Sequence, residues 1–155
     1  MRLDRITTIR DHLIAIRDRK DDGLFEMGDW LTYDDGDTYF DVFNITDESK
    51  DVVKRAHKKH CGTRGCLAGW AVVLFPDAAL DKEHSTISEV AGDILGLCPN
   101  DRHYMFLGEW AHDSRDEDHI PVEEITLDNA IDYLDKVIDQ GTALVSIEIE
   151  DDWIY

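Results

Sequence analysis

The stretch that decides the fold reads His57-Lys58-Lys59-His60-Cys61-Gly62-Thr63-Arg64-Gly65-Cys66-Leu67-Ala68-Gly69-Trp70-Ala71. It combines two histidines, two cysteines and most of a basic cluster within an acidic chain. Glycines allow a sharp corner, and a small residue beside Trp70 lets a neighbouring helix approach closely. The sequence therefore predicts a helix–helix corner as the structural keystone of the fold, built from Cys61, Gly62, Thr63, Cys66, Gly69 and Trp70.

Two helices are predicted to meet at this corner. The first begins at a cap formed by Asp47 or Ser49 and continues to residue 60. Thr63 is predicted as the N-cap of the second helix, which ends where Pro76 follows. Trp70 lies on the apolar face of the second helix, and we expect it to be buried against the last long helix of the chain.

Residues 61–71 resemble a C-G-T-x-x-C-x-A-G-W-A signature found in small, mostly uncharacterised proteins of bacteriophages and bacteria. Residues 91–97 and 105–107 are similar to later landmarks of the same proteins, so the resemblance covers residues 30–139. It implies a phage-type accessory protein and brings no reaction with it.

Apolar periodicity predicts most of the remaining elements. Helices are expected at residues 2–19, from a Thr86 cap to Gly96, from Pro99 onwards, and from Thr126 to Gly141. Residues 30–33 and 38–43 flank an Asp/Gly turn and predict a hairpin, which the alternating strand at residues 145–150 is expected to join. The prediction is a single globular domain, residues 1–155, of the α+β class, mainly α, with a small antiparallel hairpin or sheet.

Charge is the strongest compositional feature of these 155 residues, with a net value of −19. Residues 1–20 and 50–64 are basic, so the rest of the chain is more acidic still. Such a balance disfavours direct binding to nucleic acid or to a membrane and favours a protein partner with a basic surface. No apolar run resembles a signal peptide or a membrane span, which predicts a cytoplasmic protein (the host cytoplasm if viral) with reduced cysteines.

Two interpretations of the acidity stay open. The charge can serve solubility or adaptation to salt, or it can form a face that imitates nucleic-acid phosphates. For the second interpretation, the candidate interaction residues are Asp113, Asp116, Glu117 and Asp118. Inhibition of a host nucleic-acid-binding or defence complex, without catalysis, is the function that this interpretation predicts.

The histidines and cysteines allow two further hypotheses. The nitrogen and sulfur ligands that zinc prefers are supplied by His57, His60, Cys61 and Cys66, but the predicted helix cap lies between the two cysteines. The alternative is that the two cysteines are buried and the two histidines are solvated. A cysteine-dependent hydrolase would use Cys66, near a helix N-terminus, with a nearby histidine as base. We expect no bound metal or other cofactor and no catalytic residue.

Two further segments have the composition of ion sites, and each has a structural explanation as the alternative. Residues 62–65, with Arg64, Lys58 and Lys59, offer backbone N–H groups and positive charge for a phosphate, or simply a tight corner. The acidic runs at residues 34–37 and 113–118 do not follow a calcium-loop pattern, so they are interpreted as acidic turns.

Overall fold

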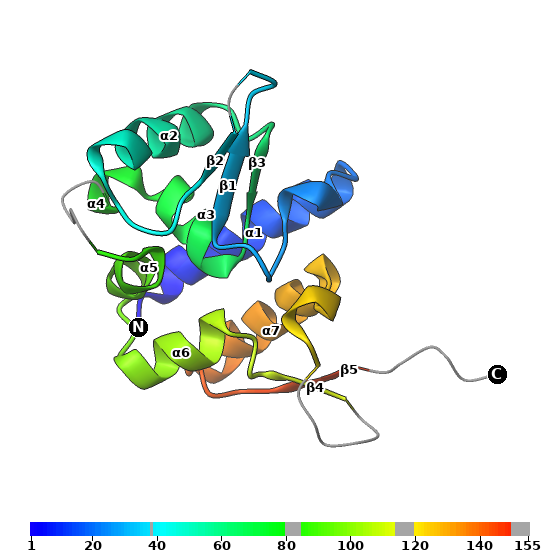
Figure 1. The fold of residues 1–155 in the computed structure, drawn as a ribbon. Helices are drawn as coiled ribbons and strands as arrows, with labels where there is room; N and C mark the ends of the chain where they lie inside the picture. The colour runs from blue at the N-terminus through cyan, green and yellow to red at the C-terminus, as the bar shows by residue number, and fades with distance from the viewer. Residues whose placement is uncertain (38, 80–84, 114–119, 150–155) are drawn as a thin grey trace.

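A buried helix, α3 (Leu67–Leu74), lies at the centre of the molecule. The computed structural model describes residues 1–37, 39–79, 85–113 and 120–149. Every residue of α3 up to Val73 is buried, because its sequence LAGWAVVL has no polar side chain to place in water. The helix packs against α1 (Leu3–Asp18), α2 (Asp47–Lys58) and α5 (Ile87–Leu95) (Figure 1).

A three-stranded antiparallel sheet covers one side of α3. The strands are β1 (Leu31–Asp34), β2 (Tyr39–Asp41) and β3 (Thr63–Gly65), in the order β2-β1-β3. Tyr33 pairs with Phe40 on one side and with Thr63 on the other. The hairpin predicted on either side of the Asp/Gly turn is therefore confirmed.

Two predicted helix caps were wrong. Thr63 is not an N-cap: after the turn at Gly62 it pairs with β1 as the first residue of β3, and Cys66 occupies the N-cap position of α3. The N-cap of α2 is Thr46 rather than Asp47 or Ser49. Ser49 lies one turn inside the helix, where its hydroxyl accepts from the Thr46 backbone N–H at 2.6 Å and so completes a capping box.

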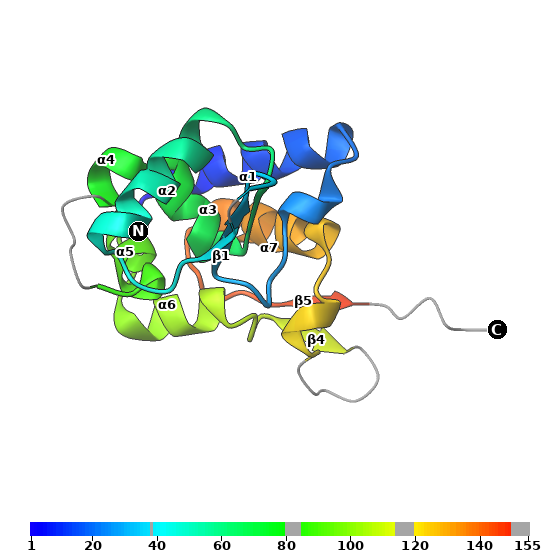
Figure 2. The same cartoon turned by 45° about the horizontal axis from the view of Figure 1, so that its top comes forward.

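The end of the molecule opposite the sheet contains α6, α7 and a strand pair (Figures 1 and 2). The bounds are α6 (Pro99–Phe106), β4 (Ala111–Asp113), α7 (Leu127–Gln140) and β5 (Ile147–Ile149). β5 pairs in parallel with β4, so the expectation that it joins the hairpin was wrong. Short helical segments complete the structure: η1 (Asp22–Leu24), α4 (Pro76–Ala79) and η2 (Val122–Glu124).

The fold class is α+β, mainly α, as the sequence predicted. The predicted N-caps Thr86 and Thr126 each accept from a backbone N–H, and Gly96 and Gly141 end their helices in the left-handed conformation. Side chains from both ends of the molecule form one buried hydrophobic cluster. Among the described residues, no helix has the length and apolar character needed to span a membrane.

Candidate interaction surface

The glycines of the keystone allow close backbone contacts between the sheet and α3. A Cβ on Gly69 would collide with the carbonyl oxygen of Trp30, and one on Gly65 would lie 3.2 Å from the same oxygen. Gly62 has φ +88°, and a Cβ there would meet the carbonyl oxygen of Asp34. The Asp34 N–H donates to the Gly62 carbonyl at 2.9 Å. The motif thus builds the strand-to-helix connection that holds β3 and α3 together.

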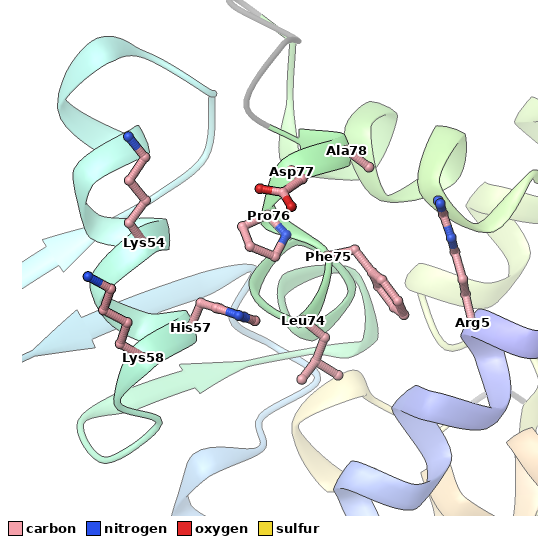
Figure 3. A pocket seen from close by; sticks show the side chains of 9 residues that line it. All are labelled: Arg5, Lys54, His57, Lys58, Leu74, Phe75, Pro76, Asp77 and Ala78. Atoms are coloured by element: carbon pink, nitrogen blue, oxygen red, sulfur yellow. The ribbon is translucent and has the colours of Figure 1, made fainter.

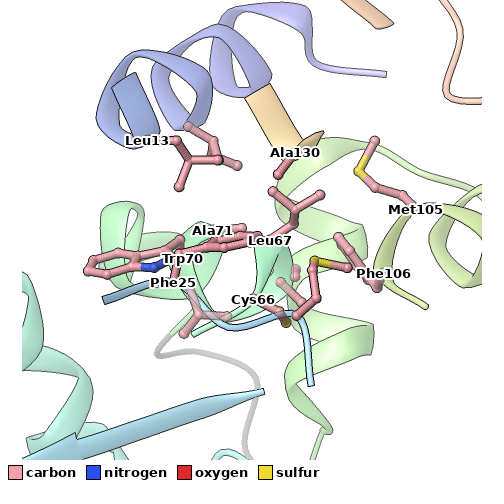
Figure 4. Close-up of a cluster of buried hydrophobic side chains, with 14 of the residues drawn as sticks. Leu13, Phe25, Cys66, Leu67, Trp70, Ala71, Met105, Phe106 and Ala130 are labelled. Atoms are coloured by element: carbon pink, nitrogen blue, oxygen red, sulfur yellow. The ribbon is translucent and has the colours of Figure 1, made fainter. Parts of the chain in front are cut away.

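Trp70 is completely buried in the core of this connection (Figure 4). Its indole N–H donates to the Leu24 carbonyl at 2.9 Å. Its ring centroid lies 4.3 Å from that of His12 on α1 and 5.4 Å from that of His60. The predicted burial is confirmed, but these partners belong to α1, η1 and the connection after α2, so the expected position against the last long helix was wrong.

His12 and His60 form an aromatic cluster with Trp70, with the two histidine centroids 4.7 Å apart. Burial, together with smaller contributions from the nearby His60 and Arg19, lowers the pKa of His12 from its ordinary value of 6.5 to about 4. The pKa of His60 is also lowered, chiefly by burial. Both rings are therefore neutral packing groups at neutral pH.

The side chains of the candidate zinc ligands do not converge on one point. His57 Nδ1 donates to the Val73 carbonyl at 2.8 Å, His60 packs on Trp70, and Cys61 is exposed. Cys66 is buried, with its thiol 3.7 Å from the Trp30 carbonyl. In the part of the chain that the structure describes, no three His, Cys, Asp or Glu side chains are grouped for a metal ion.

Cys66 has the wrong environment for a nucleophile. Burial raises the pKa of its thiol to about 11, which disfavours the thiolate that attacks a substrate. Its backbone N–H donates to the Asp29 carbonyl at 2.9 Å, so the residue anchors the start of α3. The environment of Cys66 supports a structural role.

The two ion sites considered from the sequence have structural explanations. Residues 63–65 form strand β3, so their backbone does not make the phosphate-binding loop before a helix. At the hairpin tip, carboxylates of Asp34 and Asp35 accept from the N–H groups of Gly36 and Asp37 at 2.9 Å, which makes residues 34–37 an acidic turn.

The outward face of the sheet carries exposed aromatic side chains among carboxylates. Tyr39 is 60% exposed and Phe43 is 54% exposed. Because side chains alternate along an extended segment, Tyr39, Asp41 and Phe43 share the outward face while Val42 is buried. We call this set, with its neighbours Asp34 and Trp30, the acidic–aromatic face. The ring of Phe43 meets that of Trp30 edge to face at 6.5 Å.

A shallow cavity of about 350 Å³ extends from β2 to the first turn of α2. Tyr39, Phe43, Asp41 and Glu48 are among its lining residues. β2 is an edge strand: among the described residues, only β1 pairs with it in the sheet. Exposed edges and exposed aromatic side chains are both features of protein-binding surfaces.

This face was not among the surfaces predicted from the sequence. Its signal was present in Tyr39-Phe40-Asp41-Val42-Phe43, where apolar residues fall on both faces of a short strand. The predicted interaction residues lie elsewhere. Residues 116–118 are outside the described residues, and only the backbone of Asp113 is described, in β4. Their role remains a prediction.

Comparison with protein families, with curated proteins and with solved structures found no match to this chain. The resemblance of residues 61–71 to a phage and bacterial signature therefore remains a prediction, and the functional argument depends on the geometry alone.

Proposed function

We propose that this is a non-enzymatic binding protein that docks its acidic–aromatic face on the basic surface of a protein partner. The observation that carries the proposal is the exposure of Tyr39 and Phe43 on an edge strand, beside the exposed carboxylates of Asp34 and Asp41. Aromatic side chains supply most of the binding energy at such interfaces, and charges supply orientation and association rate.

The cavity beside β2 fits a lysine or arginine side chain of the partner. An aromatic ring attracts a cation to its face, and a carboxylate pairs with it. The cavity lining offers both kinds of group, in Tyr39 and Phe43 and in Asp41 and Glu48. An extended segment of the partner could at the same time pair with the free edge of β2.

An acidic row on α7 is less suited to this role. Asp128, Asp132, Asp135 and Asp139 form an exposed row on α7. However, Asp135 pairs with Arg10 at 3.0 Å and Asp128 with Arg17 at 3.3 Å. These arginines neutralise two of the four carboxylates in the row. At the acidic–aromatic face, the arginine of β3, Arg64, pairs instead with Asp29 beside the face, at 3.2 Å.

A partner that binds nucleic acid is the most economical choice, because its basic surface is built for phosphates. In this form of the proposal, the protein acts in the cytoplasm of a bacterial host as a phage-type factor. It inhibits a nucleic-acid-binding or defence complex by occupying the phosphate site.

The proposal is tested by capture on the immobilised protein from a bacterial extract at low salt, followed by elution with salt. The retained protein is then purified and challenged with short duplex DNA. Displacement of the complex by DNA, together with loss of binding at high salt, is the expected result. A partner whose binding is insensitive to both DNA and salt would contradict phosphate mimicry.

A further inference from the structure

A second surface site lies between α1, α2 and the end of α3, and it has the opposite charge. It is a cavity of about 480 Å³, within the range of small-molecule sites. Figure 3 shows its lining residues, which come from α1, α2, the end of α3 and α4. They are Arg5, Lys54, His57, Lys58, Leu74, Phe75, Pro76, Asp77 and Ala78.

One wall of the cavity is basic because of helical spacing on α2. Lys54, His57 and Lys58 lie at positions i, i+3 and i+4, which share one helix face. Within the described residues, neither Lys54 nor Lys58 takes part in an ion pair. Both lysine side chains therefore line the same cavity, in a protein whose net charge is −19.

His57 is held in a defined orientation at this wall. Its Nδ1 lies 2.8 Å from the Val73 carbonyl oxygen, which can only accept a hydrogen bond. Nδ1 must therefore carry the proton, and Nε2 is left to interact with a ligand. On the neutral ring, Nε2 is a hydrogen-bond acceptor.

The opposite wall is apolar and is fixed by Arg5. The Arg5 guanidinium lies 5.3 Å from the centre of the Phe75 ring and donates to the Ile94 carbonyl at 2.9 Å. Leu74, Phe75 and Pro76 are half-buried and continue this wall. The cavity thus combines basic side chains of α2 on one side with apolar surface on the other, and the carboxylate of Asp77 at the start of α4 also lines it.

We infer that this cavity binds a small organic phosphate, with the phosphate group at Lys54 and Lys58 and the organic group against Leu74, Phe75 and Pro76. Ammonium groups act as point charges that suit a phosphate dianion. A carboxylate is better matched by the planar fork of an arginine, and one arm of Arg5 is already engaged with the Ile94 carbonyl. This inference is independent of the proposed function, because the two sites share no residue.

The experiment is calorimetric titration of the full chain at constant ionic strength with phenyl phosphate, inorganic phosphate and phenol. Phenyl phosphate is expected to bind about tenfold more tightly than inorganic phosphate, because only it uses both walls. Phenol is expected to show no measurable binding. Equal affinity for the two phosphates, or no saturable binding of phenyl phosphate, would overturn the inference.

A pair of double variants separates the site from general electrostatics. Lys54→Met/Lys58→Met is expected to weaken phenyl phosphate binding at least about tenfold. Arg55→Met/Lys59→Met removes the same charge at the same spacing from the last turn of α2 and its C-cap, but neither residue lines the cavity. It should change the affinity less than about twofold. An equal loss of affinity in both variants would refute a built phosphate site. Self-association of the protein that only the first variant abolishes would also refute it, because an acidic segment of a second copy would then occupy the cavity.

Discussion

At the scale of single residues, Gly69 packs directly against the backbone beside β1. The Trp30 carbonyl oxygen occupies the space that a Cβ on Gly69 would need. Gly69→Ala must therefore push β1 away from α3, and we expect a loss of at least about 2 kcal/mol in the free energy of unfolding. Gly23→Ala is the control, since nothing lies within 4 Å of a Cβ at that position. Chemical denaturation of both variants checks the difference, and equal stabilities would contradict the keystone role.

His12 makes the stability of the core depend on pH. Its pKa is about 4 in the folded protein against an ordinary value of 6.5, so the unfolded chain takes up a proton first as the pH falls. Its contribution is fully present above about pH 6.5 and is lost as the pH falls toward about 4. His12→Phe keeps a ring beside Trp70 and removes this titration.

The stability of His12→Phe relative to wild type is therefore expected to rise as the pH falls through that window. Denaturation curves of the two proteins at a series of pH values provide the comparison, because the carboxylates common to both cancel. A difference that stays constant with pH would show that His12 is not held neutral by the fold.

At the scale of elements, the capping box of α7 gives a direct test of local stabilisation. Thr126 Oγ1 accepts from the Asn129 N–H at 3.1 Å, and Asn129 Oδ1 accepts from the Thr126 N–H at 3.0 Å. Thr126→Ala is expected to lower the free energy of unfolding by about 1 kcal/mol. Thr8→Ala, an exposed change inside α1, should stay within about 0.5 kcal/mol in the same thermal or chemical denaturation series.

Elements with strong local signals could be predicted from the sequence, and elements defined by partners could not. The periodicity of α1 and α7 and the caps at Thr86 and Thr126 depend on neighbouring residues, so they are visible along the chain. β3 has three residues, and it forms a strand because Thr63 and Gly65 pair with β1. For the same reason, the pairing of β5 with β4 instead of the hairpin depends on where α7 places the chain.

The candidate sites show the same division. The burial of Trp70 could be predicted from the motif. The predicted helix–helix corner was wrong, because residues 63–65 pair with β1 and Gly69 packs on the Trp30 carbonyl instead of on a neighbouring helix. The acidic–aromatic face combines Trp30 with Phe43, and the basic cavity combines Arg5 with Lys58. Such combinations are set by the packing of separate elements, which no spacing along the chain reveals.

At the scale of the whole molecule, the negative net charge predicts that electrostatic attraction speeds association with a basic partner. The Asp113/Asp116/Asp118→Asn variant, which lowers the negative charge of the predicted interaction segment, should slow association more than it speeds dissociation. Both rate constants are measured across a salt series, because screening acts over about 8 Å at physiological ionic strength. Association that depends neither on salt nor on these residues would mean that the charge serves solubility alone.

The central claim is that a partner binds the acidic–aromatic face, and the most direct measurement compares partner affinity for two surface variants. Tyr39→Ser/Phe43→Ser removes the exposed aromatic side chains of that face. Leu107→Ser/Leu144→Ser removes exposed apolar side chains, 40% and 59% exposed, near α6 and β5. The account predicts that the first variant binds the captured partner at least about tenfold more weakly while the second binds like wild type. Unchanged affinity in the first variant, or equal loss in both, would contradict it.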